Sequence, residues 1–328
     1  MNRRGQLLAL LADGELHSGE ALARALGVTR SAIAKQVRSL APWGLRVEAH
    51  ARRGYRLEAP LELLDAARLQ AALLPATRAR LDRLELHEEL ESTNSRLLAE
   101  SGLPAGRWRA CLAEYQSAGR GRRGRPWLQP YASGLCLSFA WLYDPAPASL
   151  GALSLAAGVA ALRALARHGA GELALKWPND IQCHGGKLGG ILAELRFEAA
   201  GPAYVVVGLG LNVRLPAGFA ATIEAAGGVR PADLADIVPL PSRNRLAATL
   251  LDELSAAMVE FGERGFAPFA AEWSRCDALR DRPVRVQGPA TARDGFARGI
   301  DAQGSLRVEF AGQVESLTAG EVTLRAVA

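Results

Sequence analysis

The spacing of apolar residues changes twice along this chain of 328 residues, and each change indicates a different kind of domain. Over about the first forty residues, apolar side chains recur at helical spacing. From about residue 84, strand-like and helix-like segments alternate, and after residue 283 five short strands follow within about fifty residues. We therefore predict a multidomain α+β protein with boundaries at residues 1–60, 61–276 and 277–328, the last part being a small β-barrel.

The start of the chain has the pattern of a helix-turn-helix. Two N-cap residues, Ser18 and Thr29, each precede a short run of helical apolar spacing, and Gly27 lies between the runs, where the chain must turn. Helices are predicted over residues 4–12, Gly19–Leu26 and Arg30–Leu40, the last with Ile33, Val37 and Leu40 on its buried side. Two short helices joined by a glycine turn, the second with a basic face, are typical of DNA-binding helix-turn-helix domains.

Net positive charge is confined to this module. Residues 1–60 hold ten Lys and Arg against five Asp and Glu, whereas residues 61–328 hold 29 of each. This asymmetry favours a polyanionic partner over the alternative, a small helical bundle whose charges are merely solvated. Two alternating runs, Leu45–Ala49 and Tyr55–Leu57, predict a β-hairpin wing. We expect the second of the two helices and the wing tip to contact DNA through Arg30, Ser31, Lys35, Gln36, Arg52 and Arg53.

The central part contains a loop of arginines and glycines, Gly119–Trp127 (GRGRRGRPW), between two predicted strands, Ala110–Glu114 and Gly134–Leu142. Its glycines let the backbone approach a ligand closely, and its guanidinium groups can bind phosphate oxygens in pairs. It is not a Walker loop, because no Gly-Lys-Ser/Thr follows. The alternatives are an arginine-glycine segment for RNA or a merely exposed loop, but both fit a tail better than a position between apolar strands.

Lysine is scarce, and its placement marks two further motifs. Of 39 Lys and Arg residues only Lys35, Lys176 and Lys187 are lysine, and the last two lie in KWPND (residues 176–180) and GGKLGG (185–190). A compact ammonium group suits a site that needs a point charge instead of a planar fork, although Lys176 as a surface charge at a strand end remains an alternative. A third motif, GLGLN, ends at Asn212, which could contact an adenine or ribose or cap a turn.

The remaining segments of the chain complete a mixed pattern. We predict helices over Leu61–Leu84, Leu150–His168 and Arg245–Gly262, and strands over Leu173–Lys176, Gly189–Phe197 and Tyr204–Leu209. The five C-terminal strands are predicted at Val284–Gln287, Phe296–Ile300, Leu306–Glu309, Gln313–Ser316 and Val322–Arg325.

The cysteines and the hydropathy of the chain indicate its cellular compartment. Four widely spaced cysteines without a CxxC pair argue against a zinc site and against a disulfide framework. No run of about 18 uncharged apolar residues occurs, so no membrane span is predicted. We therefore expect a cytoplasmic protein with no metal site of its own and no membrane partner.

Taken in order, these motifs resemble the bifunctional biotin protein ligases that also repress the biotin operon. The resemblance covers essentially the whole chain, and the arginine loop followed by KWPND is its most specific part. The matching segments are Glu91-Ser92-Thr93-Asn94, Tyr115-Gln116-Ser117-Ala118 leading into GRGRRGRPW, then KWPND, GGKLGGIL, GLGLN and the final Gly320–Arg325. The family implies a winged helix-turn-helix, a catalytic domain like that of class II aminoacyl-tRNA synthetases, and an SH3-like C-terminal barrel.

The resemblance implies a two-step reaction and a set of site residues. Biotin and Mg²⁺·ATP would give biotinyl-5′-AMP and pyrophosphate, and a lysine of the biotin carboxyl carrier protein would then take the biotinyl group. Arg122 and Lys187 would be the catalytic cations. Biotin would be bound by Ser92, Thr93, Asn94, Gln116, Arg120, Gly121, Arg122 and Lys187. ATP and the adenylate would be bound by Arg122, Arg125, Trp127, Lys176, Asn179, Asp180, Asn212 and Arg325.

The resemblance also implies regulation by the reaction intermediate. Biotinyl-5′-AMP would act as corepressor and promote a homodimer through the catalytic domains, so that two winged helices reach two operator half-sites. The segment after Asn212 contains no tryptophan that could close over the adenylate, and Phe219 is the residue we expect in that place. Two other functions fit parts of the pattern: a catalytically inactive, ligand-sensing regulator, and a lipoate-type ligase with the same catalytic fold.

Overall fold

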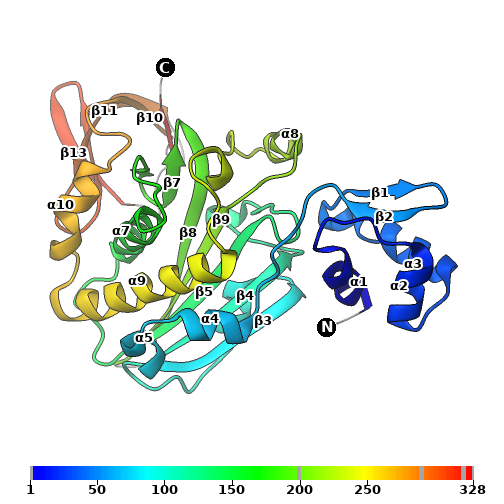
Figure 1. Ribbon diagram of the computed structural model, residues 1–328. Helices are drawn as coiled ribbons and strands as arrows, with labels where there is room; N and C mark the ends of the chain where they lie inside the picture. Colours follow the sequence, from blue (N-terminus) through cyan, green and yellow to red (C-terminus); the bar gives the residue numbers. More distant parts are fainter. Residues whose placement is uncertain (1–2, 198–200, 288–291, 319–322, 327–328) are drawn as a thin grey trace.

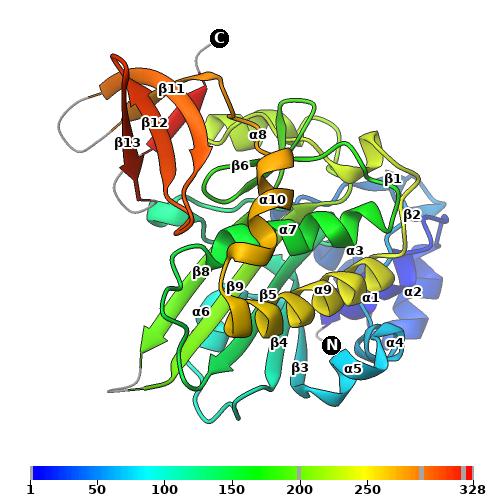
Figure 2. The same cartoon turned by 90° about the vertical axis from the view of Figure 1, so that its left-hand side faces the viewer.

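The computed structural model describes residues 3–197, 201–287, 292–318 and 323–326. Its elements form three groups along the chain: a small helical module with a hairpin, a seven-stranded sheet with helices packed on it, and a five-stranded sheet (Figures 1 and 2). The predicted multidomain α+β architecture is confirmed. Among the helices of the described segments, none has both the length and the apolar character needed to cross a bilayer.

The N-terminal module is a winged helix-turn-helix. Ser18 Oγ accepts a hydrogen bond from Ala21 N at 3.0 Å, and Thr29 Oγ1 accepts one from Ala32 N at 3.2 Å, so both predicted N-caps are confirmed. The third helix ends at Arg38, two residues before the predicted end, yet Leu40 is still buried. The elements are α1 (Arg3–Leu11), α2 (Gly19–Leu26), α3 (Arg30–Arg38) and the antiparallel hairpin of β1 (Val47–His50) and β2 (Gly54–Leu57).

This module shares a core with the central part of the chain. The Trp43 ring stacks on Tyr131 with centroids 4.6 Å apart, and Tyr131 N donates a hydrogen bond to Trp43 O at 2.8 Å. Tyr131 and Ala132 belong to the same buried cluster as the leucines of α1. The winged module is therefore packed on the body and not merely tethered to it.

The central sheet has the strand order β3-β4-β5-β9-β8-β7-β6, with β3 and β4 parallel and the other pairs antiparallel. Helices α7 (Leu153–Ala166) and α9 (Arg243–Arg264) cover one face and α6 (Thr93–Leu98) the other (Figure 2). Because both faces are covered, the central strands are apolar almost throughout. The strands are β3 (Leu81–Leu90), β4 (Trp108–Gln116), β5 (Gly134–Tyr143), β6 (Ala174–Lys176), β7 (Asp180–Cys183), β8 (Gly186–Phe197) and β9 (Ala203–Asn212).

One predicted element of the body is wrong. The single helix expected over Leu61–Leu84 is two short helices, α4 (Ala66–Ala72) and α5 (Pro75–Ala79), followed by the edge strand β3. Pro75 begins α5 at a position where its missing N–H costs nothing, and the alternating Leu84 and Leu86 pack on the core from β3. Elements that the sequence did not suggest are α6, β7, α8 (Phe219–Ala225) and α10 (Ala267–Arg275).

The five predicted C-terminal strands are all present. They form an antiparallel sheet in the order β13-β12-β11-β10-β14. This sheet is joined to the KWPND motif, because Trp177 Nε1 donates to Gly304 O, between β11 and β12, at 3.0 Å. The strands are β10 (Pro283–Gln287), β11 (Ala292–Ile300), β12 (Leu306–Phe310), β13 (Gln313–Leu317) and β14 (Thr323–Ala326).

Candidate active site

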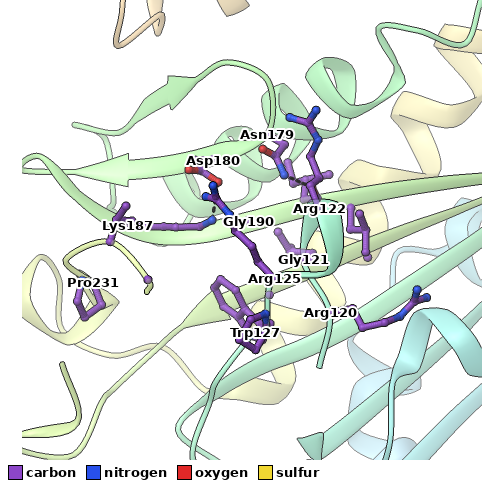
Figure 3. Close-up of a pocket in the computed structure, with 18 of the residues that line it drawn as sticks. Arg120, Gly121, Arg122, Arg125, Trp127, Asn179, Asp180, Lys187, Gly190 and Pro231 are labelled. Carbon is purple, nitrogen blue, oxygen red and sulfur yellow. Dashed lines mark hydrogen bonds and ion pairs between the residues drawn. The ribbon is translucent and has the colours of Figure 1, made fainter. Parts of the chain in front are cut away.

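A cavity of about 950 Å³ brings the four central motifs together (Figure 3). It is lined by fourteen of the predicted ligand-binding residues: Ser92, Thr93, Asn94, Gln116, Arg120, Gly121, Arg122, Arg125, Trp127, Lys176, Asn179, Asp180, Lys187 and Asn212. Arg325 lies in β14, and its side chain is outside the described part of the chain. Residues up to 120 positions apart thus share one cavity, because β4, β7, β8 and β9 lie in one sheet.

One end of the cavity is a fixed network of neutral polar groups. Thr93 donates from its backbone N and from Oγ1 to Gln116 Oε1, at 2.8 and 3.0 Å. Ser138 Oγ lies 2.7 Å from Thr93 Oγ1 and 2.5 Å from Asn94 Oδ1. A Cβ at Gly208 would lie 2.2 Å from Asn94 Oδ1, so only glycine fits beside this amide. Ser138 lies in no motif that would have revealed it. Gly208 is the first glycine of GLGLN, but the motif does not say that this glycine faces Asn94.

The other end of the cavity is strongly cationic. Seven basic side chains line the cavity, and among its described lining residues Asp180 is the one carboxylate. Lys187 Nζ lies 2.6 Å from Asp180 Oδ1. Burial, followed by the charges of Arg123 and Arg125, lowers the pKa of Arg122, with Asp180 opposing them. Like charges held together at this cost are typical of a site for a polyanion such as a triphosphate.

The arginine loop folds into a tight hairpin over the cavity. Trp127 N donates to Gly119 O at 2.8 Å, and Gly121 N donates to Arg125 O at 2.7 Å. The Trp127 ring lies directly on Gly210, where a Cβ would come within 2.4 Å of ring atoms, and Lys187 Nζ lies 5.7 Å from the ring centroid. Arg120 differs from its neighbours, because its side chain points away from Lys187 and Asp180 and pairs with Glu194 (Figure 3).

Two predicted nucleotide ligands also support the cavity wall. Asn179 Nδ2 donates to Ile191 O at 2.7 Å, and Asn212 Nδ2 donates to Ala232 O at 3.0 Å and to Lys187 O at 3.3 Å. Within the described residues, Asn212 Oδ1 is buried without a hydrogen-bond partner. That oxygen leaves an acceptor available to a ligand N–H or O–H.

The sequence missed two segments that line the cationic end. Ile223 and Val229 come from the segment after Asn212, and Leu279 and Arg282 come from the approach to β10. Phe219 begins α8 and is not among the lining residues, and its place over a bound adenylate stays a prediction. The segment is hydrogen-bonded to the backbone of Lys187, because Lys187 N donates to Arg230 O and Lys187 O accepts from Ala232 N, both at 2.9 Å.

Two places in the described residues carry side chains that could bind a metal ion. Glu85, His87 and Cys111 offer ligand atoms within 4.8 Å of one another, away from the cavity. Arg96 already binds both Glu85 oxygens at 3.0 Å, and burial raises the pKa of the Cys111 thiol to about 12, so this group suits an ion-pair network better than a cation. In the cavity, Asp180 is the one carboxylate among the described lining residues, and one of its oxygens lies 2.6 Å from Lys187 Nζ.

The titration of Lys176 gives a testable pH dependence. Burial lowers the pKa of Lys176 below the usual lysine value, with Lys187 and Arg125 adding to the shift and Asp180 opposing it. The ammonium charge is therefore lost earlier as the pH rises. We expect KM for ATP to increase by up to about tenfold per pH unit above that lowered pKa. Lys176→Arg should remove this step because arginine stays protonated; parallel KM profiles for the two proteins would contradict the role.

The predicted DNA-contacting residues lie on the surface of the winged module. Arg30, Ser31 and Lys35 are exposed on α3, and Gln36 is half-buried. Arg52 and Arg53 are exposed in the turn between β1 and β2, a hairpin that projects from the module (Figure 1). These positions are compatible with the predicted contacts.

Comparison with known proteins agrees with both parts of the chain. Residues 88–212 match the Biotin/lipoate A/B protein ligase family, and residues 3–56 match the HTH domain. The fold is similar to that of the biotin protein ligase from Aquifex aeolicus in complex with biotin and ATP, with a TM-score of 0.64 and 26% identity over 75% of this chain and 100% of that chain.

Full-length relatives combine the two parts in the same order. The chain is 38% identical to the bifunctional ligase/repressor BirA of Salmonella typhimurium, over 97% of this chain and 96% of that protein. It is also 38% identical to the bifunctional ligase/repressor BirA of Escherichia coli, over 98% of this chain and 96% of that protein. The chain therefore belongs to the family of bifunctional biotin ligase/repressors.

Proposed function

We propose that this chain activates biotin with ATP, transfers it to a lysine of the biotin carboxyl carrier protein, and represses transcription through its winged helix. The observation that carries the proposal is the cavity itself, in which a neutral amide and hydroxyl network adjoins the basic side chains around Lys187 and Asp180. A ureido ring and a triphosphate need these two environments side by side. Both roles belong in the cytoplasm, where carrier protein and operator DNA are found.

In the first step the biotin carboxylate attacks the α-phosphorus of ATP and pyrophosphate leaves, giving biotinyl-5′-AMP. Both reactants are anions, so fixed cations offset their repulsion and the charge that develops at the five-coordinate phosphorus. Lys187 takes this role, and Arg122 clamps the phosphates and then the intermediate. Thr93, Asn94 and Gln116 hold the ring, and Asp180 meets the Mg²⁺ that accompanies ATP.

In the second step the lysine amine of the carrier attacks the mixed-anhydride carbonyl, and AMP leaves with its electron pair. Until the carrier arrives, the arginine loop keeps water and stray amines from the intermediate. The two backbone hydrogen bonds within the loop support this shielding role, because they hold residues 119–127 together as one hairpin.

The boundaries that we propose follow the three element groups: residues 1–60 bind the operator, residues 61–276 carry catalysis, and residues 277–328 complete the nucleotide end. A homodimer is supported by the shape of β8. This strand pairs with β7 only as far as Gly190 and then runs on to Phe197 beside β9 alone, among the described strands. Its unpaired edge, with Leu195 exposed, is a template for a second copy.

Operator binding should depend on the charges of α3 and of the wing. Lys35→Ala and Arg53→Ala are each expected to weaken binding to a duplex carrying the promoter of the biotin genes. Each lost phosphate contact should lower the slope of log K against log salt by about one. Arg264→Ala, an exposed arginine at the end of α9, is the control. Salt slopes equal to the wild type in both module variants would argue against these contacts.

Substrate choice separates the proposal from its alternatives. We expect ATP–pyrophosphate exchange that depends on biotin and that lipoate does not support at the same concentration. Exchange driven by lipoate would favour a lipoate-type ligase. Ligand binding without any exchange would favour an inactive, ligand-sensing regulator.

A further inference from the structure

We infer that Glu194 is a positioning residue that joins the arginine loop to the ring-binding end of the cavity. The inference rests on the proposed function. Glu194 lies in β8 and is not itself one of the residues that line the cavity. Its two partners, Asn94 and Arg120, both line it. Glu194 therefore acts on the ligand only through them.

The first partner is the amide of Asn94. Asn94 Nδ2 donates to Glu194 Oε2 at 2.8 Å and to Leu192 O at 3.1 Å, so both amide hydrogens are taken by β8. On the opposite side, Asn94 Oδ1 lies 2.5 Å from Ser138 Oγ. A carboxylate can only accept hydrogen bonds, so it determines which side of the amide faces β8. Glu194 thereby fixes the orientation in which Asn94 presents its oxygen.

The second partner is Arg120, the first arginine of the loop. Arg120 Nη2 donates to both Glu194 oxygens, at 3.2 and 3.1 Å. Arg120 also forms a backbone bridge with Pro126, at the base of the hairpin. The ion pair therefore ties the base of the hairpin to β8, and Arg122 follows two residues later. The pair is partly exposed, with 42% of the Arg120 side chain and 26% of the Glu194 side chain accessible, so it can open when the loop moves.

One carboxylate thus serves both halves of the site. A change at Glu194 should loosen the ring end and the loop together, while Lys187, which lies on β8 and not on the loop, stays in place. The expected signature is a higher KM for biotin and faster loss of the intermediate, with kcat for adenylate formation nearly unchanged.

The test compares Glu194→Gln, Glu194→Asp, Arg120→Ala and the double variant Glu194→Gln/Arg120→Ala in the full chain. The control is Glu309→Gln, which breaks a strand glutamate–arginine pair of similar exposure in the C-terminal sheet. Two readouts are used: biotin-dependent pyrophosphate exchange for KM and kcat, and biotinylation of serum albumin for escape of the intermediate.

Glu194→Gln should raise KM for biotin and albumin labelling by about tenfold each, with kcat within about twofold of the wild type. Glu194→Asp should recover part of both losses. Arg120→Ala should raise albumin labelling as much as Glu194→Gln does, but should raise KM for biotin less. The double variant should have a higher KM for biotin than Arg120→Ala, with little further albumin labelling. The Glu309→Gln control should match the wild type in both readouts.

The inference is overturned if Glu194→Gln matches the control in KM and leak. It is equally overturned if kcat and thermal stability fall together without a change in KM, because a merely structural role would do that. A wild-type chain without biotin-dependent exchange would instead overturn the proposed function, and this inference with it.

Discussion

Lys187→Ala is expected to slow the formation of biotinyl-5′-AMP by about 10²- to 10³-fold at saturating biotin and ATP. Three hydrogen bonds to its main chain fix Lys187, from Ala232 N, from Asn212 Nδ2 and to Arg230 O. Its ammonium group lies 2.6 Å from Asp180. Removing it leaves an unpaired carboxylate beside the phosphates and takes away charge needed as the phosphorus becomes five-coordinate. Pyrophosphate exchange measures the loss.

The matched contrast is Arg122→Gly in the same assay. Its guanidinium belongs to the arginine loop, which we propose shields the intermediate, so we expect adenylate formation to continue while the intermediate escapes and acylates lysines at random. Exchange rates close to the wild type in Lys187→Ala would refute the role of that ammonium group. Retention of the intermediate by Arg122→Gly would refute the shielding role of the loop.

Glu114→Ala is expected to lower the free energy of unfolding by about 3–5 kcal/mol. Glu114 Oε2 lies 2.7 Å from Arg243 Nη2, and both side chains are almost fully buried, with 5% and 6% of their surface accessible. Arg243 also donates to Gly134 O at 2.7 Å, and Glu114 accepts from Leu64 N. Without the carboxylate, a guanidinium group remains buried among carbonyl groups, and the segment before α4 loses one hydrogen bond, from Leu64 N.

Urea denaturation provides the measurement for this second prediction. Arg285→Ala breaks a pair with Asp294 on the exposed face of the C-terminal sheet and serves as the control. We expect little change in the control, since exposed ion pairs contribute little to stability. A Glu114→Ala protein as stable as the control would contradict the account.

Local signals in the sequence predicted local structure well. The caps at Ser18 and Thr29, the glycine turn at Gly27 and the alternation in the C-terminal strands each depend on neighbours in the chain. The edge strand β3 was mistaken for helix because Leu81 and Leu84 also have helical spacing, and only pairing with β4 decides between the two.

Most cavity residues were predicted because they lie in short motifs of several polar, basic or glycine residues. The residues that hold them in position were not predicted. Ser138, Gly208 and Glu194 lie on three different strands, and only the sheet brings them to Asn94. The segment after Asn212 contains no tryptophan, yet its aliphatic residues Ile223 and Val229 line the cavity. Aliphatic side chains give no sequence signal that separates a ligand wall from ordinary packing.

We propose that one chain both activates biotin and passes it to a carrier protein. The most direct test of this proposal is the intact mass of an apo biotin carrier domain after incubation with the purified full-length chain, biotin and Mg²⁺·ATP. We predict that the carrier gains the mass of one biotinyl group on its single target lysine, with one AMP released per group transferred, and that it gains none without ATP. An unchanged carrier mass, under conditions in which the same preparation catalyses biotin-dependent pyrophosphate exchange, would show that the chain does not pass biotin to the carrier.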